Sequence, residues 1–174
     1  MFISFIIAKA TIFKLFPLGY IMEKHILRYE KVILQIINKS FPILKGKKIR
    51  VYEKIKLKFS SADANKFLFY GLRIRTHPRL RKYNQNLLIG IFAHEISHLE
   101  YFEKRPFYHY FIRGFKKKPD KLEEEKTDKT AIKKGYAREL YLQRKSRWKS
   151  NNPNKKFYLS PLEIKKYAES IGKW

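Results

Sequence analysis

The stretch NQNLLIGIFAHEISHLEYFEK, residues 84–104, determines how the rest of the sequence is interpreted. Asn84 is a good helix cap, and the long apolar run that follows it indicates a buried helix. On a helix, the four-residue spacing of His94 and His98 places both imidazoles on one face, with Glu95 beside them. Burying these three polar side chains without partners would cost roughly several kcal/mol. The HExxH pattern therefore predicts a metal site with two histidine ligands inside a core helix.

A third ligand is expected downstream, because a catalytic zinc site has three protein ligands and one open position for water. The segment EEEKTDKTAIKKGYAREL, residues 123–140, supplies Glu124 and Asp128 at helical spacing. One acid could bind the metal while the other, one turn away, accepts the free ring N–H of a histidine ligand. Glu95, offset by one position, could take a proton from the metal-bound water.

HExxH followed by E-x-x-T-D on a second helix resembles the gluzincin metallopeptidases, which include thermolysin relatives, HtpX and the CAAX prenyl proteases. Its short length makes the chain most similar to the small minigluzincins, and the similarity covers residues 22–142. The resemblance implies Zn²⁺ held by His94, His98 and Glu124, Asp128 behind His94, and hydrolysis of a peptide or protein substrate. It also raises latency through a C-terminal segment in the cleft, within one molecule or between two, with a simple packing helix as the alternative. Glu100 departs from the usual uncharged residue and is expected to face the surface.

Other assignments compete with this one. His109 could be the third ligand, as in SprT-like metalloproteases that act near DNA, and the net charge of +25 would suit that role. A non-catalytic, zinc-stabilised protein that binds nucleic acid is a further alternative, although a structural site has no need of Glu95. The metzincin pattern is excluded because Lys104 occupies its third histidine position. Nucleic acid is not favoured as a partner, since the basic residues recur throughout the chain without a recognised motif.

The composition indicates one globular domain. The chain has 174 residues, of which 44% are hydrophobic and 32% are charged. It contains no cysteine, which excludes disulfides, thiolate ligands and a cysteine nucleophile. Histidines and carboxylates are then the side chains left to bind a metal.

Residue patterns predict an α+β fold, which the resemblance makes zincin-like. Ile26, Tyr29, Ile33 and Ile36 or Ile37 form the apolar face of a backing helix. Alternation predicts two strands in a small antiparallel or mixed sheet, and a helix is expected to begin at Asp120 and to end at Gly135. The predicted segments are a helix at 22–39, strands at 50–59 and 66–76 with a turn at 60–65, helices at 84–104 and 120–135, a short helical piece near 137–140 and a terminal helix from Ser160.

The chain is expected to comprise an apolar N-terminal extension (1–21), a catalytic domain (22–144) and a basic linker with a C-terminal helix (145–174). Lys9 and Lys14 interrupt the apolar start, so a membrane span is not predicted, although contact with a membrane surface is an alternative. The extension is interpreted as lying upstream of a working start at Met22. A cytoplasmic location, with peripheral membrane association as the alternative, is expected.

Peptide substrates of such enzymes bind along an exposed sheet edge, for which the strand from Phe67 to Ile74 is the candidate. Tyr136 and Arg138 are possible donors to the oxyanion, and neither is assigned. His25 and His77 are interpreted as ordinary histidines outside the site.

Overall fold

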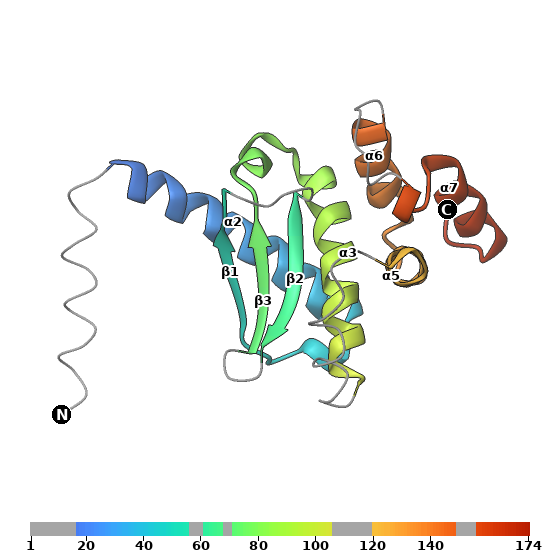
Figure 1. The fold of residues 1–174 in the computed structure, drawn as a ribbon, viewed down its shortest axis with the longest axis horizontal. Helices are drawn as coiled ribbons and strands as arrows, with labels where there is room; N and C mark the ends of the chain where they lie inside the picture. The colour runs from blue at the N-terminus through green and yellow to red at the C-terminus, as the bar shows by residue number, and fades with distance from the viewer. Residues whose placement is uncertain (1–16, 56–60, 68–70, 106–119, 149–155) are drawn as a thin grey trace.

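The structure is a computed structural model that describes residues 17–55, 61–67, 71–105, 120–148 and 156–174. These residues form an α+β fold with five α-helices and a three-stranded mixed sheet (Figure 1). The sheet order is β1-β3-β2, so β3 (Gly71–Thr76) is central. It pairs in parallel with β1 (Ile49–Glu53) and antiparallel with β2 (Ala62–Phe67). The predicted mixed α+β class is therefore confirmed.

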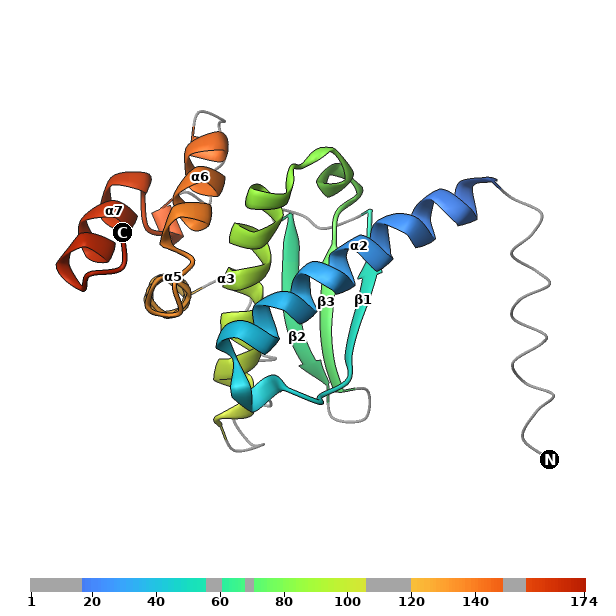
Figure 2. The ribbon, with the colours of Figure 1, turned by 180° about the vertical axis from the view of Figure 1, so that it is seen from behind.

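Helix α2 (Pro17–Ser40) crosses one face of the sheet, as Figure 2 shows from behind. The predicted apolar face is confirmed, since Tyr29, Ile33, Ile36 and Ile37 are all buried. The helix begins at Pro17, so the predicted boundary between residues 21 and 22 falls inside it. In the described part of the chain no helix is long and apolar enough to cross a bilayer.

Helix α3 (Gln85–Glu103) packs against β2 and α2. Its predicted cap is confirmed, because the side-chain oxygen of Asn84 accepts from the backbone N–H of Leu87 at 3.0 Å. Gly90 allows α6 (Ala137–Trp148) to approach closely, since a Cβ at this position would collide with the backbone carbonyl of Glu139. The apolar run before the HExxH motif is thus held between the sheet and α6.

The remaining helices lie on the other side of α3 from the sheet (Figure 1). Helix α5 (Lys121–Lys133) is capped by Asp120 as predicted, and Gly135, at a φ of +93°, ends the turn after it. Helix α7 (Pro161–Ser170) has the predicted capping box between Ser160 and Glu163. It packs on α5 and α6.

Several predictions about the sheet were wrong. The single strand predicted at 66–76 corresponds to the end of β2 and to β3, so the described residues form three strands where two were predicted. Residues 62–65, predicted as part of a turn, belong to β2, where Asp63 lies opposite Arg75 and forms an ion pair with it at 2.5 Å. Cross-strand pairing outweighs the turn preference of Asp and Asn. The predicted inward residue Ile55 is 78% exposed because β1 ends at Glu53, and the predicted Leu57 and Phe59 lie outside the described residues.

Glu100 is buried rather than surface-facing, with 4% of its surface exposed. Lys104 and Lys134 both reach its carboxylate, at 3.0 and 3.3 Å, and these two cations compensate the burial of the charge. Residues 145–148, predicted as the start of the linker, belong to α6, which continues to Trp148, and residues 149–155 lie outside the described residues.

Candidate metal centre

The predicted histidines and Glu124 meet where α3 faces α5. Nε2 of His94 lies 3.1 Å from Oε2 of Glu124, and Nε2 of His98 lies 3.3 Å from the same oxygen. The two imidazoles are nearly perpendicular, with ring centroids 4.8 Å apart. All three side chains are buried, and their ligand atoms lie within 4.8 Å of one another. This group could hold a metal ion.

Asp128 lies behind His94, one turn along α5 from Glu124. Its Oδ1 is 2.7 Å from Nδ1 of His94 and also accepts from Nη2 of Arg144 at 2.7 Å. Its Oδ2 accepts from the backbone N–H of Leu159 at 3.1 Å. These contacts use both oxygens of a carboxylate that is 0% exposed.

The carboxylates shift the ionisation of the centre. Burial alone would lower the pKa of His94, but the charge and hydrogen bonds of Asp128 and Glu124 outweigh burial and raise it to about 10. Burial would raise the pKa of Glu124, whereas its hydrogen bonds with His94 and His98 hold it well below the usual range. The pKa of Asp128 is also lowered against the effect of burial, through Arg144 and His94. Both acids are therefore carboxylates when they face the imidazoles.

The hydrogen-bond partners of Nδ1 in both histidines orient the imidazoles so that Nε2 faces Glu124. The hydroxyl of Thr127 donates to the backbone carbonyl of Glu123 at 2.8 Å, so its oxygen can accept from Nδ1–H of His98 at 3.3 Å. Asp128 can accept from Nδ1–H of His94 in the same way. When each ring is neutral and carries its proton on Nδ1, the lone pair of Nε2 points into the cluster. A histidine that binds a metal needs this state.

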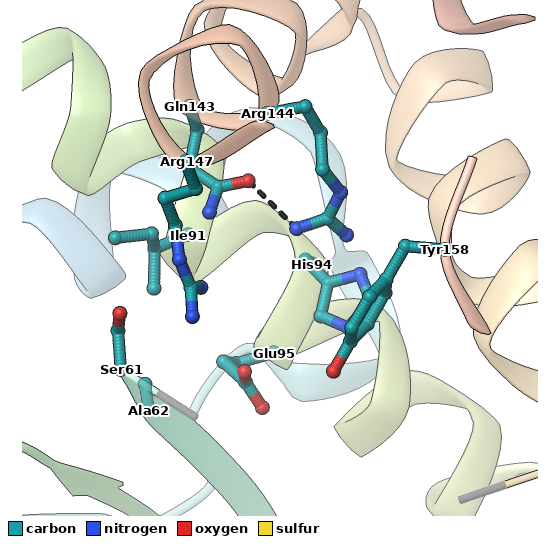
Figure 3. Close-up of a pocket in the computed structure, with 9 residues that line it drawn as sticks. All are labelled: Ser61, Ala62, Ile91, His94, Glu95, Gln143, Arg144, Arg147 and Tyr158. Carbon is teal, nitrogen blue, oxygen red and sulfur yellow. Dashed lines mark hydrogen bonds between the residues drawn. The ribbon is translucent and has the colours of Figure 1, made fainter. Parts of the chain in front are cut away.

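Glu95 is buried beside the two histidines and is 8% exposed. Burial raises the pKa of its carboxyl group, and the nearby histidines oppose this shift. Figure 3 shows its carboxylate in a pocket that His94 also lines, whereas Glu124 belongs to the opposite helix α5. Glu95 is thus placed to act on a group bound near the histidines rather than to close the cluster.

Residues from α6 and from the segment before α7 complete the pocket, and the sequence analysis did not single them out (Figure 3). The ring of Tyr158 packs edge-on to His94 with centroids 5.7 Å apart, and the guanidinium of Arg144 lies 4.3 Å from the centroid of Tyr158. Leu140, Gln143, Arg144 and Arg147 have the i, i+3, i+4, i+7 spacing of one helix face. That spacing could have indicated one face of a helix that packs on the protein. The face was not identified because it combines an apolar residue with polar and charged ones.

The other candidate residues lie elsewhere. The hydroxyl of Tyr136 donates to the backbone carbonyl of Ile36 at 3.3 Å, and Arg138 is exposed, so neither lines the pocket. Nδ1 of His77 accepts from the backbone N–H of Arg79 at 3.1 Å and caps a short helical turn. His25 lies beside Tyr29, with ring centroids 6.5 Å apart, which agrees with an ordinary role outside the site. His109 lies outside the described residues.

The chain matches no protein-family model, no curated protein and no solved structure. The geometry of its own residues therefore carries the functional argument.

Proposed function

We propose that this protein is a zinc-dependent peptidase of the gluzincin type, in which His94, His98 and Glu124 hold the metal and Glu95 is the general base. The observation that carries the proposal is the spacing of the three ligand atoms. Bonds of about 2.0–2.1 Å at tetrahedral angles require ligand atoms roughly 3.3 Å apart. The two contacts of Glu124 Oε2, at 3.1 and 3.3 Å, agree with two edges of such a tetrahedron.

The donor set supports zinc. Two imidazole nitrogens and one carboxylate oxygen form the ligand set of many hydrolytic zinc sites, which leave the fourth position for water or substrate. The hydrogen bond from His94 to Asp128 fixes the ring and makes the imidazole a stronger ligand. A purely structural site would usually close its fourth position, and the base Glu95 beside the cluster favours an enzyme.

The mechanism follows from what each side chain can do. Bound zinc would lower the pKa of a water molecule and polarise the substrate carbonyl. Glu95 accepts the proton of the attacking water and passes it to the amine of the leaving peptide. Its raised pKa suits this double task, because the carboxyl group must hold the proton between the two transfers. Asp128 keeps Nδ1 of His94 protonated and the ring in place.

A substrate strand is proposed to bind along β2. Within the described residues β2 pairs only with β3, and it lies alongside α3. The predicted edge, Phe67 to Ile74, was wrong because most of its described residues belong to the central strand β3. Backbone groups on the outer side of β2 could pair with an extended peptide and bring one of its carbonyls to Glu95.

The test compares Glu95→Gln with the unaltered chain. The variant should bind one equivalent of zinc yet hydrolyse casein and a peptide library at least about 100-fold more slowly, because the general base is gone. Glu169→Gln, an exposed change on α7, serves as the matched control and should keep full activity. Retained turnover in Glu95→Gln would remove Glu95 from the mechanism. No hydrolysis by the zinc-loaded unaltered chain, nor by the zinc-loaded chain that ends at Lys149, would reject the peptidase proposal.

A further inference from the structure

One wall of the pocket beside Glu95 consists of hydrogen-bond donors. Ser61 immediately precedes β2, and Gln143 and Arg147 project from α6 toward the same part of the pocket (Figure 3). Figure 3 shows the guanidinium of Arg147 reaching between Ser61 and Glu95. This donor wall, defined as Ser61, Gln143 and Arg147, lies next to the group that acts on the substrate in the proposed function.

Two of these donors are buried without a partner among the described residues. Ser61 and Gln143 are each 1% exposed, and neither Oγ of Ser61 nor Nε2 of Gln143 has a hydrogen bond there. The orientation of the amide is fixed, because Oε1 of Gln143 accepts from Nη1 of Arg144 at 2.7 Å. Nε2 therefore carries the free N–H groups. Leaving such donors unpaired is unfavourable, so the pocket is suited to a group that accepts hydrogen bonds.

The guanidinium groups of Arg144 and Arg147, which both line the pocket, favour an anion as that group, whereas the carboxylate of Glu95 in the same pocket opposes it. Tyr83 and Tyr158 favour the charged form of Arg147, which also experiences the positive charges of Arg144 and Arg79. Burial lowers the pKa of Arg147, and those two arginines lower it further, so an added negative charge would relieve the repulsion. An acceptor with two oxygens also matches the planar fork of a guanidinium.

The size of the space restricts the group further. The centre of a water-sized sphere can occupy only about 20 Å³ of the pocket. That is about the room of a single water molecule, and it is too narrow for an aromatic ring. The space therefore admits one oxygen of a small group such as a carboxylate, and the rest of that group must lie outside it.

We propose that the donor wall binds a carboxylate of the peptide substrate, so that cleavage favours bonds next to an acidic group. The inference deepens the proposed function and rests on it for the identity of the ligand as a peptide. The carboxylate can be the C-terminal group of the substrate or an Asp or Glu side chain near the cleaved bond. In the first case the enzyme would trim C-termini, and in the second it would cut within chains at acidic residues.

The activity test uses two matched pairs of peptides with the zinc-loaded full chain. One pair differs only in a C-terminal acid or amide, and the other carries an internal Glu or Gln with both ends blocked. We expect at least about a tenfold higher kcat/KM for the acidic member of one pair, a size typical of a charge-assisted pair. Arg147→Gln should reduce this ratio towards one. Arg138→Gln, an exposed arginine on the same helix, should leave the ratio unchanged.

A binding test separates failure of the subsite from failure of the peptidase proposal. Acetyl-glycine, acetyl-glycinamide, acetyl-glutamate amide and acetyl-glutamine amide are titrated into the zinc-loaded chain, and the side-chain N–H signals of Gln143 and Arg147 are followed by NMR. We expect an acid to shift both signals and its neutral partner to shift neither. The acid should bind at least about tenfold more weakly to Arg147→Gln. Ser61→Ala offers a milder change should Arg147→Gln fail to fold.

The results of the two tests distinguish failure of the carboxylate subsite from failure of the peptidase proposal. Peptide cleavage with equal rates for acidic and neutral partners overturns the carboxylate subsite and leaves the peptidase proposal standing. Binding of an acid at Gln143 and Arg147 supports the subsite, and it rejects the peptidase if neither the full chain nor the chain that ends at Lys149 cleaves any peptide. An acid that binds the metal instead would do so equally well in Arg147→Gln, and that result overturns the subsite.

Discussion

Asp128→Asn should weaken both the fold and the metal centre. The carboxylate is fully buried and receives Nδ1–H of His94, a guanidinium N–H of Arg144 and the backbone N–H of Leu159. An asparagine has one acceptor oxygen and no charge, so it cannot accept all three of these hydrogen bonds. Arg144 then becomes a buried cation without its counter-ion. Breaking a buried pair in this way costs about 3–5 kcal/mol. The zinc affinity should fall about 10–100-fold, because His94 loses the partner that orients it.

Two measurements check this prediction. Urea unfolding of the metal-free chain gives the loss in free energy of unfolding, and competition with a fluorescent chelator gives the zinc dissociation constant. Glu125→Gln is the matched control, since it removes one charge from the same helix at a pair with the exposed Lys121, where Glu125 is itself half-buried, and should cost less than about 1 kcal/mol. A variant with the stability and zinc affinity of the unaltered chain would refute the role of Asp128.

Three further predictions concern the packing of α3 on α6, the pH dependence of zinc binding and the C-terminal segment. Gly90→Ala, which usually stabilises a helix, should cost about 1–3 kcal/mol here because the methyl group meets the backbone of Glu139, and a higher urea midpoint would contradict that packing. His94, with a pKa of about 10, must lose a proton when zinc binds, so between about pH 7 and 9 the zinc dissociation constant should fall about tenfold per pH unit. Calorimetry in two buffers should find about one proton released per zinc, and a pH-independent affinity would count against this. Deletion after Lys149 removes Tyr158, whose ring packs on His94. Peptide cleavage should therefore rise if the C-terminal segment maintains latency, and unchanged activity in a folded variant would reject latency.

The sequence analysis identified the candidate metal ligands because their spacing is local. Helical periodicity alone puts His94 and His98 on one face, and the acidic spacing on α5 does the same for Glu124 and Asp128. The contact between these two faces depends on tertiary structure, which helical spacing alone does not predict. The resemblance implied this contact, and the distances between Glu124 and the two histidines describe it. Caps were equally local, as Asn84 illustrates.

The failures concern features set by tertiary contacts. Asp63 favours a turn when considered alone, yet its ion pair with Arg75 places it in a strand. Glu100 is buried because Lys134, distant in sequence, reaches it. The buried face of α6 also escaped prediction, because Gln143 and Arg144 are residue types usually found on surfaces. Their environment depends on how α6 packs against α3.

Zinc binding by the full chain and by Glu124→Gln, measured side by side by native mass spectrometry, tests the central claim most directly. The account predicts one zinc per chain, held tightly by the unaltered protein and lost from the variant at equimolar metal, because two imidazoles alone form an incomplete site. Equal zinc occupancy in both proteins, or none in the unaltered chain, would contradict it.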